Sequence, residues 1–382
     1  MKVCMVVNNP FINDSRVLRE AKTLSKNGYK VTVYATKGKR LPNQERINQV
    51  IIKRLVSRYD LTFKFWKLFS ELLPIKDMLI KEEANVYHSH DLDTLLITYL
   101  AAKANNAKLI YDSHEFWADK TVEGKLFKKY TYKFVQKSFL PKLEGFLIAS
   151  AEEVITVNNS ISSLLASKYD IKRPIVIRNV AEKKTFKKTD YFKKLLNLND
   201  SDKVILYLGV MRENRGLENL IKSADYLPRN FKIVMLGYGP LKGKLQDLIV
   251  KKGLSSKVFV KNQVLPEKVV EVSASADIGV APIQNASKSY FYSSPNKVFE
   301  YIAAGIPVAA SDFPELRKII SDNKIGDVFD PENPKDIAAK INSIISDTKI
   351  LEEIKKNVKV LFETKLNWEI EEKKLLNMYK NL

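Results

Sequence analysis

The chain has 382 residues, 45% of them hydrophobic and 28% charged, and its formal net charge is +20 at pH 7. This length is more than one hydrophobic core usually serves, and the composition excludes a disordered chain, so we expect two folded domains. The one cysteine, Cys4, excludes an internal disulfide and a cysteine-rich metal site, which is typical of a protein from a reducing cytoplasm.

The first half of the chain predicts strands and helices in alternation. A strand over residues 3–7 is followed by a polar loop, an amphipathic helix over 16–28 and a second strand over 29–35. The same succession recurs across residues 83–113. Repeated βαβ units predict a doubly wound parallel sheet, so we expect a Rossmann-like domain over residues 1–180.

All three histidines, His88, His90 and His114, lie near the ends of two successive strands of this domain, so we expect them to share a cleft. The segment HSHDLD is similar to His-x-His metal sequences, but its aspartate spacing does not match the metallohydrolase pattern. Hydrogen-bonded structural histidines are the other alternative. The DxD triplet that begins at Asp91 is explained as a helix N-cap, and the one that begins at Asp200 as part of a linker, so we expect no bound metal.

Two segments of the first half combine basic and aromatic residues. Four lysines follow one another at i,i+4 steps from Lys125 to Lys137, beside an aromatic face, and residues 63–79 have the same character. Such faces favour an anionic membrane surface, although ordinary amphipathic helices would have the same pattern. No window reaches the length of apolar sequence that spans a bilayer, so any membrane contact is expected to be peripheral. No nucleic-acid-binding module is present, and no nucleic-acid partner is expected.

The second half repeats the alternation of strands and helices. Strands are predicted over 204–210, 231–237, 257–262 and 276–283, and a last helix and strand end at Ser311. The polar, lysine-rich stretch 179–203 indicates a linker that ends in a short helix. We therefore expect a second Rossmann-like domain over residues 181–382, with a C-terminal helix that can pack back on the first domain.

The segment SPNKVFEYIAAGIPVAAS, residues 294–311, predicts a helix that begins beside a ligand. Pro295 suits the first helical position, and Ser294 can cap the helix from the residue before it. Lys297 adds a full positive charge to the free N–H groups of the first turn, which makes an anion site. Glu300 lies on the same face and can accept hydrogen bonds from a vicinal diol such as a ribose. The pair fits a nucleoside diphosphate, and a simple surface ion pair is the alternative.

This segment resembles the retaining, nucleotide-sugar-dependent glycosyltransferases of family 4, also called group 1. Weaker matches are DSRVLREAKTLSKNGYKVTVYA, YDSHE, LGVMRENRGLENLI and LGYGPLKGKL. The resemblance covers most of the chain and implies a GT-B fold, in which two Rossmann-like domains face each other. Glu300 aligns with the glutamate that binds the nucleotide ribose. The family has a second glutamate eight positions earlier, and this chain has Tyr292 there.

The resemblance also implies the site residues. His114, Arg215 and Lys297 form the expected catalytic set, in which His114 matches a first-domain histidine that acts on the donor sugar. The donor-binding set is Arg212, Arg215, Gly239, Tyr292, Ser294, Asn296, Lys297 and Glu300. The acceptor-side set is Asn13, Asp14, Arg16 and His90, although Asp14 is equally explained as a helix N-cap.

The expected function is transfer of a sugar, with retention, from a UDP- or GDP-linked donor to a glycan or lipid-linked acceptor in bacterial cell-surface polysaccharide or glycoconjugate synthesis. No cofactor is expected besides the nucleotide-sugar co-substrate. The expected location is the cytoplasm, with peripheral contact to the inner face of the plasma membrane. Two alternatives remain open, which are a catalytically silent glycosyltransferase-like subunit, suggested by Tyr292, and a nucleotide-sugar epimerase of the same fold.

Overall fold

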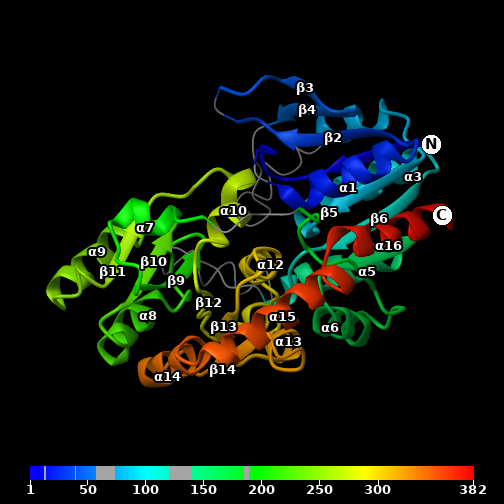
Figure 1. Cartoon of the computed structure of the whole chain (residues 1–382). Coiled ribbons are helices and arrows are strands. Elements are labelled where there is room, and N and C mark those ends of the chain that lie inside the picture. The colour runs from blue at the N-terminus through cyan, green and yellow to red at the C-terminus, as the bar shows by residue number, and fades with distance from the viewer. Residues whose placement is uncertain (13, 39, 57–73, 120–138, 185–188) are drawn as a thin grey trace. The chain divides into compact units, whose positions relative to one another are not determined.

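The computed structural model describes residues 1–12, 14–38, 40–56, 74–119, 139–184 and 189–382 (Figure 1). The chain divides into two compact units, one formed by Met1–Arg178 with Glu372–Leu382 and the other by Asn179–Glu371. Asn13, the lysine stripe from Lys125 to Lys137 and most of segment 63–79 lie outside the described residues. Among the residues that are described, no helix has both the length and the apolar character needed to cross a bilayer.

The first unit is built on an eight-stranded sheet in the order β3-β4-β2-β1-β5-β6-β7-β8. Its strands are β1 (Lys2–Val6), β2 (Lys30–Thr36), β3 (Gln44–Ile47), β4 (Val50–Val56), β5 (Val86–His90), β6 (Lys108–Ser113), β7 (Glu153–Thr156) and β8 (Ile175–Val176). All neighbours run parallel except β3 and β4, which form an antiparallel hairpin at the edge. The strand order reverses between β1 and β5, where doubly wound sheets bind ligands at the carboxyl ends of their strands.

The helices of the first unit are α1 (Ser15–Lys26), α3 (Leu92–Ala104), α5 (Leu140–Ala149), α6 (Asn159–Tyr169) and the last part of α16 (Trp368–Lys380). Of these helices, α1 and α3 follow their strands as the sequence predicts, whereas α5 and α6 were not predicted. Asp14 is the N-cap of α1, where its carboxylate accepts a hydrogen bond from the Val17 N–H at 3.1 Å. Its alternative interpretation as a helix cap is therefore confirmed.

The second unit has a six-stranded, fully parallel sheet in the order β11-β10-β9-β12-β13-β14. Its strands are β9 (Lys203–Leu208), β10 (Phe231–Leu236), β11 (Val258–Lys261), β12 (Ile278–Ala281), β13 (Val308–Ser311) and β14 (Gly326–Phe329). The order 3-2-1-4-5-6 is that of the Rossmann fold, so the predicted doubly wound architecture is confirmed. The strand order reverses between β9 and β12.

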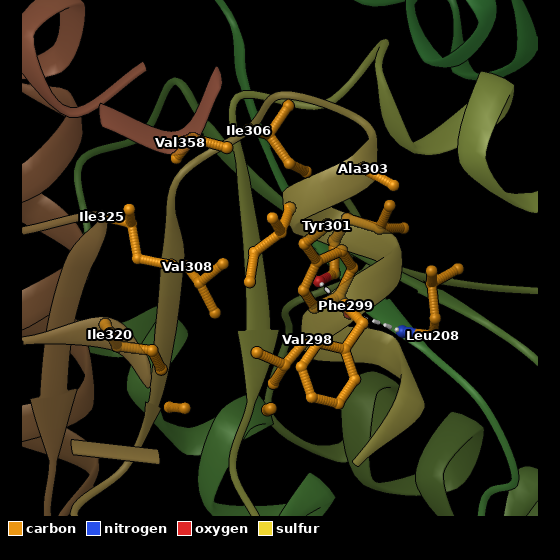
Figure 2. Close-up of a cluster of buried hydrophobic side chains, with 14 of the residues drawn as sticks. Leu208, Val298, Phe299, Tyr301, Ala303, Ile306, Val308, Ile320, Ile325 and Val358 are labelled. Carbon is orange, nitrogen blue, oxygen red and sulfur yellow. Dashed lines mark hydrogen bonds between the residues drawn. The ribbon is translucent and has the colours of Figure 1, made fainter. Parts of the chain in front are cut away.

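Helices cover both faces of this sheet because successive residues of a strand point to opposite sides. Val204 and Leu206 of β9 pack with α10 (Val269–Ser273), α12 (Asn296–Ala303), α13 (Pro314–Ile320) and α15 (Thr348–Thr364). Ile205 and Tyr207 pack with α8 (Leu217–Ser223), α9 (Lys242–Lys251) and α14 (Pro334–Ile345). Figure 2 shows the first of these cores around α12 and β13.

The stretch expected to be a linker is part of the second unit. Val180 and Phe192 are fully buried in its core, and Phe192 belongs to the short helix α7 (Tyr191–Leu196). The main-chain N–H of Trp368 also donates to the carbonyl of Ala181 at 2.9 Å. The description as a polar linker was therefore incomplete, because a few apolar residues among the lysines anchor the segment.

Candidate functional site

Helix α12 starts one residue later than the sequence predicts. It begins at Asn296, and Pro295 is its N-cap with extended backbone and no side-chain capping bond. The predicted capping by Ser294 is therefore wrong. Pro295 fits either position, because its fixed φ suits both an extended residue and a first helical turn. The N–H groups of the first turn of α12 consequently donate no hydrogen bond to an N-cap side chain.

Lys297, in the first turn of α12, is buried, with 8% of its side chain exposed. Its ammonium lies 3.7 Å from the centre of the Tyr207 ring. Gly209 follows β9 with φ +124°, and a Cβ at this position would lie 3.5 Å from the Lys297 ammonium. Among the described residues, no carboxylate lies within ion-pair distance of Lys297. An aromatic face and nearby backbone therefore surround this cation.

The loop after β9 brings two arginines to one tyrosine. The guanidinium of Arg215 lies 4.9 Å from the centre of the Tyr290 ring. Arg212 donates from Nη2 to the Tyr290 hydroxyl at 3.3 Å. Tyr290 itself belongs to α11 (Lys288–Phe291), whose N-cap Ser287 accepts a hydrogen bond from its N–H. The two arginines expected to bind a diphosphate are thus held by the same side chain.

Close backbone packing fixes the shape of this loop. A Cβ on Gly216, which has φ +65°, would lie 1.8 Å from the carbonyl oxygen of Pro282. A Cβ on Gly239, with φ +147°, would lie 2.2 Å from the carbonyl oxygen of Met211. Both positions require glycine, because any side chain would displace main chain rather than a flexible side chain. Gly239, predicted as a donor-binding residue, therefore has a packing role that does not depend on a ligand.

The electrostatics of the cluster favour an anion. Burial lowers the pKa of Lys297 well below its ordinary value, and the charges of Arg215 and Arg212 lower it further. Burial raises the pKa of Tyr207 to about 12, so this phenol stays neutral and does not act as a counter-ion. Three cations in one partly buried place repel one another, and a bound di-anion would remove that repulsion. The carboxyl ends of β9 and β12 therefore form a candidate diphosphate site.

The remaining predicted donor residues lie on α12 or in the segment between α11 and α12. Glu300 is half-buried one turn after Lys297 and close enough to raise the pKa of that lysine, against the larger effect of burial. Asn296 is exposed, and Ser294 is half-buried just before α12. Tyr292 follows α11 and packs edge-on against Phe291, with ring centres 5.0 Å apart. A tyrosine thus stands where the family has a carboxylate.

Tyr301 fixes α12 to the sheet. Its hydroxyl accepts from the Leu208 N–H at 3.0 Å (Figure 2). The hydroxyl also lies 3.0 Å and 3.2 Å from the carbonyl oxygens of Leu206 and Val280. The ring lies over Gly279 of β12, where a Cβ would be 2.2 Å from the ring carbon Cγ. The buried phenol therefore joins β9 to β12 one turn beyond Lys297.

In the first unit, His114 lies between two carboxylates. Its Nε2 is 3.1 Å from Asp112 Oδ2 and its Nδ1 is 3.4 Å from Asp91 Oδ2. Burial alone would lower the pKa of His114, but Asp91 and Asp112 outweigh it and raise the pKa to about 10. The imidazole is thus a cation at neutral pH.

Asp91 is the N-cap residue of α3, as the sequence predicts, but its side chain makes no capping hydrogen bond. Its Oδ1 accepts from the His114 N–H and from Trp117 Nε1, both at 3.0 Å. It also has φ +68° and ψ 164°, a conformation that is strained for any residue except glycine. The predicted cap position is therefore confirmed, whereas the carboxylate binds the loop after β6 instead of the first turn of α3.

Arg16 and His90, expected on the acceptor side, are almost fully buried, with 3% and 2% of their surfaces exposed. Arg16 donates from Nε and Nη2 to the two oxygens of Asp112 at 2.9 Å and 2.8 Å, and from Nη1 to the Ile177 carbonyl. His90 Nδ1 lies 3.3 Å from the same carboxylate. This burial does not match contact with an acceptor. Both side chains instead hold Asp112 in place against His114.

Four buried side chains of this unit, Glu20, His88, His90 and Asp112, each offer a ligand atom within 4.8 Å of the others. The guanidinium of Arg16 already lies among them, 3.2 Å from Glu20 Oε1 and paired with Asp112. A fixed cation at the centre disfavours a second one. The sequence predicts no bound metal, and this cluster gives no reason to replace that prediction.

Sequence reasoning missed the side chains that hold the predicted residues. The structure places Tyr207 beside Lys297, Tyr290 beside Arg215 and Asp112 beside His114. The two tyrosines are far in sequence from the cations that they contact, so no local pattern indicates these pairs. Asp112 belongs to the YDSHE segment, two residues before His114, and is the one that a strand-end argument would have found.

Two family models match the chain. The model described as Glycosyltransferase Family 4 matches residues 15–180, and the model described as glycosyl transferases group 1 matches residues 188–360. An uncharacterized glycosyltransferase of Methanocaldococcus jannaschii is 25% identical over 372 residues, which cover 94% of this chain and 92% of that protein. The chitobiosyldiphosphodolichol beta-mannosyltransferase of Candida albicans is 27% identical over 159 residues, covering 40% and 34% of the two chains.

Solved structures show the same fold. Sucrose-phosphate synthase from Thermosynechococcus elongatus has a TM-score of 0.80 at 16% identity, covering 100% of this chain and 98% of that one. Anabaena Alr3699/HepE in complex with UDP and glucose has a TM-score of 0.75 at 13% identity, with both chains fully covered. With both family models matched in order along the chain and two Rossmann-like sheets in the structure, this protein belongs to the group 1 glycosyltransferases of family 4 and has the GT-B fold.

Proposed function

We propose that this glycosyltransferase transfers a sugar from a UDP- or GDP-linked donor to a glycan or lipid-linked acceptor, with retention at the anomeric carbon and without a metal ion. The observation that carries the proposal is the cluster of Lys297, Arg212 and Arg215 at the carboxyl ends of β9 and β12. A nucleoside diphosphate has the opposite charge to this cluster, and the end of a doubly wound sheet is where such ligands bind.

The leaving group determines what the protein must supply. As the bond between the sugar and the diphosphate breaks, negative charge grows on the diphosphate oxygens. Lys297, Arg212 and Arg215 stabilise this charge, because they are in place before the reaction begins. Glu300 accepts hydrogen bonds from the ribose diol and so fixes the nucleotide beside them. The leaving diphosphate takes the acceptor proton on the same face of the sugar, which leads to retention.

The choice of UDP as the first nucleotide to test follows from a structural neighbour. Anabaena Alr3699/HepE was solved in complex with UDP and with UDP-glucose. Identity at this level supports the fold alone, so GDP and its sugars belong in the same screen. The proposal for this chain therefore names a nucleoside diphosphate and leaves the base to experiment.

Calorimetry tests the proposal. We expect the protein to bind UDP or GDP, and Lys297→Met to reduce that affinity about 10- to 100-fold while the affinity for the free nucleoside stays unchanged. Glu300→Gln should weaken both ligands, because it removes charged acceptors from the ribose. Lys335→Met, which changes a lysine that lies 5.6 Å from the Tyr226 ring, is a matched control. Absence of binding by the wild-type protein would favour the silent subunit instead.

The acceptor side of the proposal comes from the sequence. The lysines at i,i+4 steps from Lys125 to Lys137 suit an anionic membrane that carries a lipid-linked acceptor on the inner face of the plasma membrane. Such a site fits a role in cell-surface polysaccharide or glycoconjugate synthesis. We expect binding to vesicles of phosphatidylglycerol to weaken steeply with salt and on Lys125→Gln with Lys129→Gln and Lys133→Gln. Vesicle binding that does not change with salt concentration would contradict this part of the proposal.

A further inference from the structure

Lys297 and Arg215 are held by aromatic side chains in a way that the proposed function does not require. In proteins, buried cations are usually held by carboxylates, which neutralise them. Here the described contacts of Lys297 and Arg215 are the rings of Tyr207 and Tyr290. Among the described residues, neither cation lies within ion-pair distance of a carboxylate.

We propose that Tyr207 and Tyr290 are positioning residues of the diphosphate site, which fix Lys297 and Arg215 in place and leave their charge available to the ligand. The inference rests on the proposed function. An aromatic face attracts a cation through its quadrupole but carries no net charge. A carboxylate in the same place would compete with the incoming diphosphate for each cation.

Tyr207 has two separate contacts that serve this role. Its ring lies under the Lys297 ammonium, 3.7 Å from centre to nitrogen. Its hydroxyl lies 3.1 Å from the carbonyl oxygen of Val210 and donates to it, at the start of the loop that carries both arginines. The side chain is fully buried in strand β9, so its position is fixed by the sheet. One residue thus sets the distance between α12 and the arginine loop.

Tyr290 joins the two arginines. Its ring lies under the Arg215 guanidinium at 4.9 Å, and its hydroxyl accepts from Arg212 at 3.3 Å. The Arg215 guanidinium is planar and has donors around its edge, so stacking on the Tyr290 ring leaves those donors for phosphate oxygens. Without this ring, two like charges on one short loop would move apart.

The contacts separate into ring and hydroxyl contributions, which single substitutions can test. Tyr207→Phe keeps the ring below Lys297 and removes the bond to the Val210 carbonyl. Tyr207→Met keeps most of the volume and removes the ring. Tyr290→Phe keeps the contact with Arg215 and removes the acceptor for Arg212, and Tyr290→Leu removes both. Tyr226→Leu removes the exposed ring beside Lys335 and serves as the control.

The experiment is calorimetric titration of each variant with inorganic pyrophosphate, UDP, GDP and the free nucleosides. We expect Tyr207→Met and Tyr290→Leu to lower pyrophosphate affinity about tenfold, and each phenylalanine variant to recover most of that loss. Nucleoside affinity and the Tyr226→Leu control should stay at the wild-type value. A purely structural role would lower nucleoside and pyrophosphate affinity together.

The outcomes distinguish this inference from the proposed function. If the wild-type protein binds no diphosphate, or if Lys297→Met binds it equally well, the proposed function fails. If Lys297→Met loses affinity but folded Tyr207→Met and Tyr290→Leu bind pyrophosphate as the wild type does, only the positioning role fails. Should Tyr207→Met not fold, the half-buried Tyr290 decides the result, since its substitution leaves the sheet intact.

Discussion

The structure revises the expected role of His114 more than that of any other predicted site residue. A histidine beside a reacting sugar is usually considered as a proton carrier, but both ring nitrogens of His114 face carboxylates. A cationic imidazole with a pKa of about 10 does not act as a base at neutral pH. Asp112, paired with Arg16, orients the ring, and Asp91 binds its main-chain N–H. The arrangement fits a fixed positive charge.

His114→Gln tests that role. Glutamine keeps a hydrogen-bond donor but has no charge, so we expect the rate of sugar transfer to fall about 100-fold. The affinity for the nucleotide should change by no more than about twofold, because His114 belongs to the first unit and the donor site to the second. Steady-state kinetics and calorimetry on the same preparation measure the two effects. Equal loss of nucleotide binding would make His114 a structural residue.

The raised pKa of His114 also predicts a dependence of stability on pH. A group whose pKa is about 10 in the folded protein and 6.5 otherwise binds its proton more tightly when folded. The contribution of the His114 proton to the free energy of unfolding is complete below pH 6.5 and disappears as the pH rises toward 10. The free energy of unfolding of the wild type, minus that of His114→Gln, should therefore shrink between these values. Urea titrations at both ends measure it, and a constant difference would contradict the pKa.

At the residue scale, the sequence indicated the charged residues that the structure brings together at the candidate site, and it missed the aromatic residues that contact them. Lys297 lies in a helix start that a Pro and a Gly delimit, so spacing alone indicated it. Tyr207 lies in a buried strand, where an aromatic residue is ordinary. Its contact with Lys297 depends on α12, a helix that comes much later in the sequence. The burial of Arg16 likewise depends on Asp112, which only the folded sheet brings beside it.

At the scale of elements, Tyr301 supplies one of the buried contacts that hold α12 on the sheet. Tyr301 can bridge β9 and β12 because Gly279 leaves room for its ring. We expect Gly279→Ala to reduce the free energy of unfolding by about 1 to 3 kcal/mol, since the new methyl group overlaps the ring. Nucleotide affinity should fall as well, because α12 carries Lys297. Chemical denaturation and calorimetry measure both.

A matched glycine serves as the control. Gly243 lies in α9, and a Cβ at this position would have no heavy atom within 4 Å. Gly243→Ala should therefore stabilise the protein by about 0.5 to 1 kcal/mol without affecting nucleotide affinity. If Gly279→Ala is as stable as the wild type, the packing of Tyr301 on β12 is not what fixes α12.

Nine strands and the helices α1, α3, α8, α9 and α12 were predictable from local patterns. The expectation that the strands of the second unit end at Ser311 was wrong, because β14 follows and pairs with β13. The β3–β4 hairpin was missed because its turn is Asn48-Gln49, in which Asn48 has φ +55°, without the glycine that marks such turns in a sequence. The start of α12 was one residue off because proline is compatible with both positions. Strand β8 has two residues, Ile175 and Val176, which is too short for any periodicity.

At the scale of the whole molecule, the two units differ in what surrounds their charged side chains. The second unit places Lys297 and Arg215 on the faces of the Tyr207 and Tyr290 rings. The first unit buries charges of both signs close together. Ion pairs such as Arg16 with Asp112 offset the free-energy cost of removing these charges from water. The net charge of +20 does not reveal this difference, because it does not indicate which cations are paired.

This division predicts that catalysis needs no divalent metal. In metal-dependent transfer, a cation bound by carboxylates neutralises the leaving diphosphate, whereas in the proposed site Lys297, Arg212 and Arg215 would do so. The candidate ligands Glu20, His88, His90 and Asp112 are buried around Arg16, so a metal there would meet a fixed charge. Sugar transfer and thermal stability should be unchanged after dialysis against EDTA, and metal analysis should find less than one equivalent. Loss of activity that manganese restores would contradict the prediction, and Glu20→Gln would then show whether this cluster holds the ion.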